Sequence, residues 1–292
     1  MESIARMTTG PNPLSLAHLT IIDATPLELI DAAAAGGFDA IGLRIVAPMP
    51  TDRIVPVVGD AAMVSAIAQR LADTGVGILD VEAVWLYPDT GVDAYKPAFE
   101  TAQRLNARHF LVVGNDPDEL RLVDNFARFC ELARPHGLKA MLEFIPYCQT
   151  RTVGDAHRVV KSAAQSNAGV LVDALHLSRS GGTPDDLRAL DPAWLSYCQI
   201  CDARAEPPPA DGLRNEARTD RYYPGLGGLP LTALLDALPP GLPLGVEAPC
   251  AGYAHLPVIE RGRLAGVASR GFLNTYHQRA AAVASVSRGS GR

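Results

Sequence analysis

The sequence predicts a single-domain TIM (β/α)8 barrel from three observations. The chain has 292 residues, and an α/β barrel commonly runs to about 250 residues as one unit. Short apolar runs alternate with segments of helical spacing, which is typical of βα units. Several runs are apolar at nearly every position, as expected for parallel strands covered on both faces. Neither G-x-G-x-x-G after an early strand nor G-x-x-x-x-G-K-[ST] is present, which disfavours an open nucleotide-binding sheet.

The predicted elements follow one another in a regular order. The strand-like runs are residues 15–22, 40–45, 76–84, 109–113, 139–144, 169–173, 196–201 and 243–247. The helical segments are residues 26–35, 61–74, 95–105, 118–134, 155–165, 185–190 and 229–238, and several open on Pro or Asp, as good helices do. Residues 203–228 form a long loop, which usually belongs to a site. We therefore expect an N-terminal extension at 1–14, a barrel at 15–284 and a flexible tail at 285–292.

The composition indicates a folded protein without polyanionic or membrane partners. Apolar residues make up 48% and charged residues 20% of the chain, close to the averages for soluble proteins. The net charge is −6 and no Lys/Arg run is present, so nucleic acid is not an expected partner. No apolar stretch approaches the roughly 20 residues of a membrane span, and no signal core precedes the first strand. We expect a cytoplasmic protein, and a homo-oligomer is compatible with these features.

The cysteines do not indicate a disulfide framework or a metal site. The chain has 5 of them, widely scattered, which is too few for a disulfide-stapled fold of this length. Cys198 and Cys201 form a C-x-x-C pair. That pair falls on a predicted strand, where residues three apart point to opposite faces, so we expect neither redox nor zinc chemistry from it.

Four polar side chains stand where apolar strands end. They are Glu143, Asp173, Gln199 and Glu247, each in a different strand run, and barrel closure would bring them together at the catalytic face. Three neighbouring carboxylates repel one another unless a cation lies among them. Oxygen-only ligands suit Mn²⁺ or Mg²⁺, and also Co²⁺, better than Zn²⁺. The alternative is that these acids cap helices or pair with Arg.

Four further residues are candidate contacts for a substrate. His176, just past a strand end, is suited to a substrate hydroxyl or to acid–base chemistry near neutral pH. Arg44 is suited to binding a substrate carboxylate, and Glu82 to the substrate or to holding a metal ligand. A structural ion pair is the alternative for both. His18 is a candidate substrate contact or a satisfied core histidine.

At these residues the sequence resembles the xylose isomerase-like TIM barrels. That family includes sugar isomerases and epimerases, inosose dehydratases and 3-dehydroshikimate dehydratases. The resemblance covers about residues 15–249. Glu143 lies in an L-E-x-x-P context, and Asp173 and His176 form a D-x-x-H pair. Gln199 replaces the more common His of an H-x-x-D segment, and Glu247 matches the final strand-ending Glu. The Gln is similar to that of the dehydroshikimate dehydratase branch.

The loop before the last strand carries a second part of the resemblance. An E-A-R segment precedes a P-G-x-G-x-L-P-L turn, as in bacterial dehydratase-like members. The resemblance implies that Arg218 reaches the substrate and that Glu216 orients it. The glycines of the turn have a plainer role in letting the chain enter the next helix.

The resemblance implies a metal-dependent enzyme acting on a small polyhydroxylated carbonyl compound. Glu143 or Glu247 would remove a proton next to the carbonyl, assisted by His176. Reprotonation gives isomerisation or epimerisation, whereas loss of a β-hydroxyl gives dehydration, and both outcomes stay open. An apurinic-site endonuclease would need several His ligands and a basic face, which are missing. A non-catalytic sugar-binding barrel is the remaining alternative.

Overall fold

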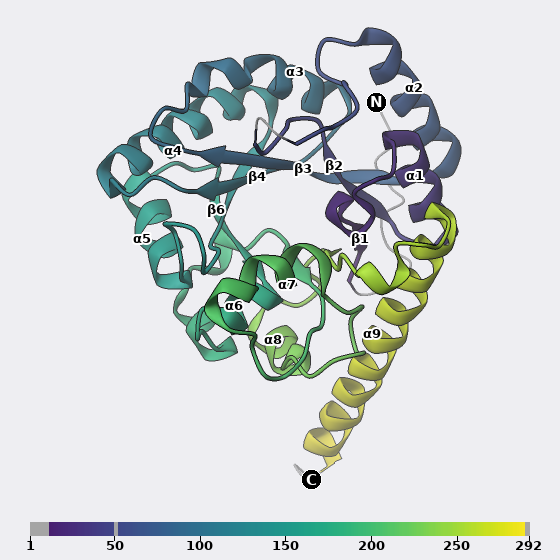
Figure 1. Ribbon diagram of the computed structural model, residues 1–292. Helices are drawn as coiled ribbons and strands as arrows, with labels where there is room; N and C mark the ends of the chain where they lie inside the picture. Colours follow the sequence, from purple (N-terminus) through teal and green to yellow (C-terminus); the bar gives the residue numbers. More distant parts are fainter. Residues whose placement is uncertain (1–11, 50–51, 290–292) are drawn as a thin grey trace.

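Parallel strands close into a barrel, which confirms the predicted single-domain TIM fold (Figure 1). The computed structural model describes residues 12–49 and 52–289, and side chains as far as residue 282. Each strand pairs with the next, and β8 pairs with β1. The strands are β1 Leu14–Leu16, β2 Ala40–Arg44, β3 Gly77–Leu86, β4 His109–Gly114, β5 Lys139–Glu143, β6 Ala168–Asp173, β7 Cys198–Ile200 and β8 Leu244–Val246.

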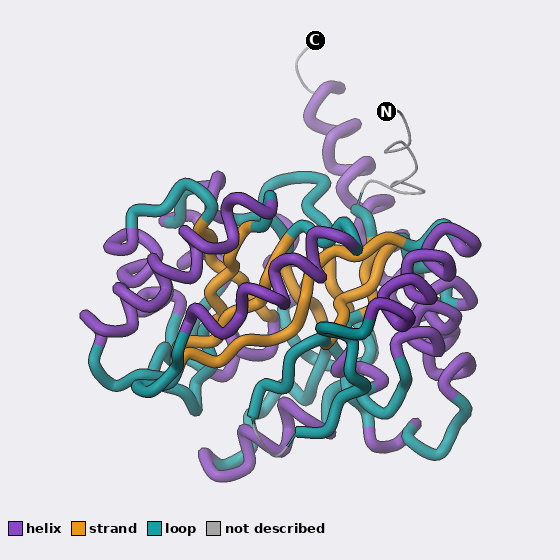
Figure 2. The backbone as a smooth tube through the Cα atoms, turned by 90° about the horizontal axis from the view of Figure 1, so that it is seen from above, coloured by secondary structure: helices purple, strands orange, loops and turns teal. Residues whose placement is uncertain are grey.

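Helices surround the barrel as an outer layer (Figure 2). They are α1 Pro26–Ala35, α2 Ala61–Thr74, α3 Lys96–Arg104, α4 Glu119–Ala133, α5 Val153–Ala163, α6 Ala174–Arg179, α7 Leu213–Thr219, α8 Leu231–Ala237 and α9 Val258–Gly289. Side-chain caps begin several of them, because Thr25, Asp60, Asp118 and Thr152 each accept a hydrogen bond from a first-turn backbone N–H. Among the described residues, no helix is long and apolar enough to cross a membrane.

The first predicted strand, residues 15–22, is shorter than expected. The strand ends at Leu16, and the chain turns into a 3-10 helix, His18–Ile21. The side chain of Thr20 takes over the contact with the neighbouring strand: its hydroxyl donates to the Val246 carbonyl at 2.8 Å and accepts from the Ala248 N–H at 2.9 Å. Apolar and β-branched composition predicted a strand here, but a side-chain hydrogen bond allows the backbone to turn.

Three other segments also differ from the prediction. Residues 185–190 lie almost entirely within a 3-10 helix, Pro184–Ala189, and the helix after β6 is α6. The predicted loop at 203–228 contains the short helix α7. α9 is an addition to the predicted elements, and its backbone continues through residues 285–289, where a tail was expected. Residues 1–11 of the expected N-terminal extension and 290–292 of the tail lie outside the described residues.

Apolar side chains fill the barrel below the carboxyl ends of the strands. Leu79, Leu111, Met141 and Leu171, from four successive strands, form one buried cluster inside the barrel. Outward-facing strand residues pack with the helices in a second, larger cluster. The polar strand-end residues therefore stand on a filled core, as is usual for this fold.

Helix α9 packs against α1, and glycines lie at the contact between the two helices. A β-carbon on Gly262 would overlap the carbonyl of Ala32, and one on Gly266 would overlap the carbonyl of Gly36. Glycine therefore allows the two backbones to approach as closely as they do. Figure 1 shows the C-terminal part of α9 continuing beyond the barrel.

Candidate functional site

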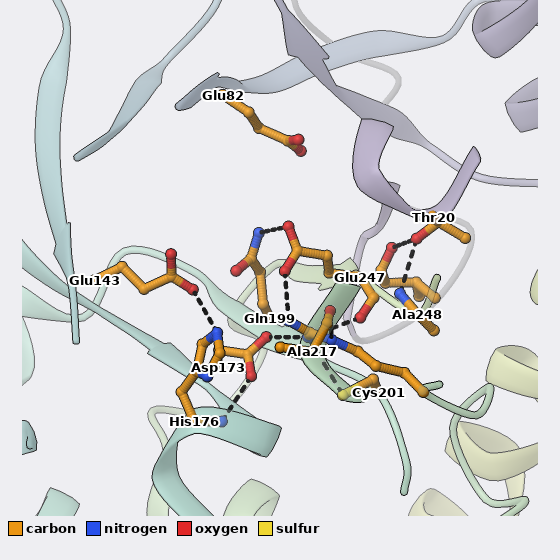
Figure 3. Close-up of polar contacts among 12 residues, drawn as sticks. Thr20, Glu82, Glu143, Asp173, His176, Gln199, Cys201, Ala217, Glu247 and Ala248 are labelled. Atoms are coloured by element: carbon orange, nitrogen blue, oxygen red, sulfur yellow. Dashed lines mark hydrogen bonds and ion pairs between the residues drawn. The ribbon is translucent and has the colours of Figure 1, made fainter. Parts of the chain in front are cut away.

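Three acidic side chains converge at the carboxyl ends of the strands, as the sequence predicts. Glu143 ends β5, Asp173 ends β6 and Glu247 directly follows β8. Each is buried, and one carboxylate oxygen from each lies within 4.8 Å of the other two. Gln199 in β7 joins them, donating its amide N–H to Glu247 Oε1 at 3.3 Å. Figure 3 shows the four side chains pointing toward one another.

A buried arginine that the sequence analysis does not single out completes this cluster. The Arg221 guanidinium donates to Asp173 Oδ2 at 2.8 Å and lies 3.2 Å from Glu247 Oε2. It also donates to the backbone carbonyls of Ala217 at 2.7 Å and Glu247 at 3.0 Å. Its side chain is only 1% exposed. Arg221 therefore compensates two of the three carboxylates, and it lies three residues beyond the predicted Arg218.

Two oxygens of the cluster have no hydrogen-bond partner among the described residues. They are Glu143 Oε1 and Gln199 Oε1, both buried. Buried polar atoms without a partner are rare in folded proteins and often mark a place for a ligand, ion or water. The unpartnered oxygens belong to two of the four residues predicted to bind a metal.

The carboxyl groups differ in their protonation behaviour. Burial raises the pKa of Glu143 well above its usual range, and the charges of Glu247 and Asp173 add to the rise. Burial also raises the pKa of Glu247, although Arg221 opposes it. Burial acts in the same direction on Asp173, but the charge and hydrogen bond of Arg221, together with the charge and backbone N–H of His176, outweigh it and lower the pKa. The described cluster is therefore short of positive charge on the Glu143 side.

His176 lies beside Glu143. Its Nε2 is 3.9 Å from Glu143 Oε1, and its Nδ1 has no partner among the described residues. The backbone N–H of His176 donates to Asp173 Oδ1 at 2.9 Å, because Asp173 caps α6. Burial lowers the pKa of His176 to about 4. The imidazole is therefore neutral at pH 7 and can donate from one ring nitrogen while accepting at the other.

Arg44 and Glu82 face the site from neighbouring strands. They stand at paired positions of β2 and β3, and Arg44 Nε is 3.8 Å from Glu82 Oε2. Neither atom has a hydrogen-bond partner among the described residues. Glu82 Oε1 accepts from the backbone N–H of His18 at 3.2 Å. Figure 3 shows the Glu82 carboxyl group directed toward the other acidic side chains from the opposite side of the site.

His18 has a structural role in this arrangement. Its Nδ1 accepts from the Arg44 backbone N–H at 3.1 Å, and its Nε2 is 2.9 Å from the Ala24 carbonyl. Burial lowers its pKa to about 4, so the ring is neutral and Nε2 carries the proton. Because both ring nitrogens bond to backbone atoms, neither is left for the predicted substrate contact.

Arg218 and Glu216 do not form the pair that the resemblance implies. Arg218 is 35% exposed at the edge of the pocket, with its guanidinium 3.9 Å from Asp52. Glu216 instead holds Arg179, with two hydrogen bonds of 2.7 and 2.9 Å. The neighbouring loop is fixed separately, because Asp202 accepts from the backbone N–H groups of Gly225 and Leu229.

A solvent-open pocket of about 470 Å³ lies over these groups. Its polar lining comes from Arg44, Glu82, Glu143, His176, Arg218, Arg221 and Glu247. Trp85, Tyr147 and several aliphatic side chains line the rest.

Comparisons with known proteins agree with this architecture. An inosose isomerase from Halalkalibacterium halodurans is 30% identical over 157 residues, which are 50% of this chain and 54% of that protein. The chain thus spans about half the length of the curated relatives it matches. The crystal structure of an IolI protein with a zinc atom aligns with a TM-score of 0.76 and 20% identity, covering 90% of this chain and 99% of that one.

A more distant structure has the same fold. The probable 3-DHS dehydratase AsbF from Bacillus anthracis aligns with a TM-score of 0.67 and 13% identity, covering 87% of this chain and 97% of that one. The family model of the xylose isomerase-like TIM barrel matches residues 30–266. The chain therefore belongs to the xylose isomerase-like TIM barrel family.

Proposed function

We propose that this chain is a divalent-metal-dependent enzyme of the sugar isomerase/epimerase type. It would remove the proton next to the carbonyl of a small polyhydroxylated substrate. The observation that carries the proposal is the convergence of three buried carboxylates within 4.8 Å, next to a Gln whose carbonyl oxygen has no partner. The inosose isomerases that match half the chain support the same class of reaction.

The donor set fits a divalent cation. Arg221 supplies one positive charge to three buried carboxylates, and of these three it contacts Asp173 and Glu247 but not Glu143. Glu143, Asp173, Gln199 and Glu247 would hold the cation through oxygen, which favours Mn²⁺ or Mg²⁺, with Co²⁺ as a substitute. When bound, such a cation would polarise the substrate carbonyl and stabilise negative charge on its oxygen.

The side chains around the cluster would handle the proton. Glu143 is the preferred base over Glu247, because its Oε1 has no hydrogen-bond partner, whereas Glu247 Oε1 accepts from Gln199 and Glu247 Oε2 forms an ion pair with Arg221. Neutral His176 would accept a hydrogen bond from a substrate hydroxyl beside that base, or donate one to it. Arg221 would hold Asp173 and Glu247 in place and orient a substrate oxygen.

The remaining polar residues would contact the substrate away from the reacting carbon. Arg44 and Glu82 present an unpartnered donor and acceptor to the pocket, and Arg218 lies at its edge. His18 is left out, because its ring nitrogens bond to the backbone.

A dehydratase of the 3-dehydroshikimate type is the second candidate. It would use the same metal and the same proton abstraction, followed by loss of a β-hydroxyl. Gln199 at the position of the more common His favours it, in agreement with the resemblance noted above.

Solvent exchange tests the proposal. Purified protein, stripped of metal and reloaded with Mn²⁺, is incubated in D₂O with inososes, ketohexoses and 3-dehydroshikimate. Deuterium next to the carbonyl, only with metal present, is the expected result. A product lighter by one water identifies the dehydratase. Tight sugar binding without exchange would instead indicate the non-catalytic barrel and refute the proposed function.

A further inference from the structure

One wall of the pocket offers only carbon to a ligand. Ala83 on β3, Leu111 and Val113 on β4, and Ile145 just after β5 all line the pocket, and they come from three successive strands or the residues that follow them. All four are buried and belong to the apolar cluster inside the barrel. We refer to these four residues as the aliphatic wall.

The backbone behind Leu111, Val113 and Ile145 is also occupied. β4 pairs with β3 on one side and β5 on the other, so its amide groups bond within the barrel. The Ile145 N–H donates to the Thr150 carbonyl and the Ile145 carbonyl accepts from the Cys148 N–H. A hydroxyl pressed against these four side chains would lose water and gain no partner from them.

Another part of the pocket lining is suited to a hydroxyl. Arg44 Nε and Glu82 Oε2 are a buried donor and a buried acceptor, 3.8 Å apart and without hydrogen-bond partners among the described residues. A single hydroxyl accepts from one and donates to the other. Arg44 is 7% exposed and Glu82 1%, so both groups gain from a ligand that satisfies them.

We infer that the substrate is a hydroxylated carbonyl compound with a hydroxyl-free edge, which lies along the aliphatic wall. Its carbonyl end faces Glu143, Asp173 and Glu247, and another hydroxyl bonds to Arg44 and Glu82. This inference rests on the proposed function and narrows its substrate class from fully hydroxylated sugars to deoxygenated ones. Ala83, Leu111, Val113 and Ile145 are then residues that determine specificity.

Matched ligand pairs test the inference on the Mn²⁺-loaded protein. The pairs are L-fructose with its 6-deoxy form, L-tagatose with its 6-deoxy form, and scyllo-inosose with 2-deoxy-scyllo-inosose. Calorimetry gives Kd for each. We expect the deoxy member of at least one pair to bind about 10- to 100-fold more tightly, the range in which apolar pockets reject an added hydroxyl. Equal or tighter binding of the hydroxylated member in every pair would overturn the inference.

Two neighbouring valines supply a matched variant and control. Val113→Thr adds a hydroxyl to the aliphatic wall without changing its shape, and should reduce the preference for the deoxy ligand several-fold. Val112 on the same strand packs in the outer cluster, because alternate strand residues point to opposite faces. Val112→Thr should leave the preference unchanged. Equal preference ratios in the two folded variants would show that the wall does not select the ligand.

The deuterium exchange experiment distinguishes a failure of this inference from a failure of the proposed function. Exchange into both members of every pair, with equal binding within each pair, would refute this inference and leave the proposed function intact. Absence of both binding and exchange across all pairs would remove the proposed function and the inference with it.

Discussion

The site has a closed half and an open half. In the closed half, Arg221 bonds to Asp173, Glu247 and two backbone carbonyls. In the open half, Glu143 Oε1 and Gln199 Oε1 are buried without partners in the described part of the chain. Buried networks whose members are all satisfied rigidify a site, whereas unsatisfied atoms gain from a ligand. Under the proposed function, the closed half would maintain the geometry and the open half would carry out the chemistry.

Glu143→Gln tests the open half and carries the largest expected effect. The substitution keeps the shape but removes the base and one ligand charge, so kcat should fall by about 10³-fold and metal should be held less tightly. Stability should not fall, because the lost charge has no arginine partner. Exchange rates and thermal unfolding measure the two quantities. Wild-type exchange in this variant would contradict the assignment of Glu143.

Arg221→Met tests the closed half. It leaves Asp173 and Glu247 buried without their counter-ion, so the free energy of unfolding should drop by about 3–5 kcal/mol. Urea titration of the metal-free protein measures it. Arg218→Met is the control, because its side chain is 35% exposed and such pairs contribute about 0–1 kcal/mol. Similar losses in both variants would argue against the distinction between the halves.

His18 makes the free energy of unfolding depend on pH. Its pKa is about 4 in the folded protein, below the value of about 6.5 for an unfolded chain. The unfolded state therefore binds more protons between these values, and stability is present above pH 6.5 and lost as pH falls toward 4. The loss attributable to His18 should approach about 3 kcal/mol. Urea unfolding of His18→Gln across this range should show a correspondingly shallower slope, and an unchanged slope would disprove the role.

Cys201→Ala should have the smallest effect. Cys201 Sγ is 3.5 Å from the Arg221 guanidinium, but Arg221 keeps its four oxygen partners without it. We expect activity within about twofold of wild type and a stability loss of about 1 kcal/mol. A folded but inactive variant would mean that the thiol takes part in the site.

The strand-end acids were predictable because their positions depend on periodicity alone. Glu143 and Asp173 close apolar runs, and parallel strands bring such residues to one end of the barrel. Arg221 was not predictable in this way, because its position depends on the path of the long loop. Its neighbours Asp220 and Tyr222 make isolated bridges to Cys250 and Asp202, which no local pattern in the sequence indicates.

The sequence also did not identify the residues of the aliphatic wall as pocket residues. Leu111 and Val113 are ordinary residues of an apolar strand, and the sequence predicts the strand without indicating which of its side chains reach the pocket. His18 shows the reverse difficulty. A polar histidine within an apolar run suggests a site residue. Its ring nitrogens instead bond to the Arg44 N–H and the Ala24 carbonyl, and those bonds depend on the turn at the end of β1, which the sequence pattern does not predict.

The junction between β1 and β8, covered by the glycine contact of α1 with α9, joins the most distant parts of the described chain. Contacts of such long sequence separation carry a large loop-closure entropy and form slowly. During synthesis the other strands can pair in turn while the last helix is still absent. Residues from β5, β6 and β8 come together only once β8 has joined the run of strands β5, β6 and β7. Under the proposed function, a nascent chain would therefore acquire its metal-binding geometry late in folding.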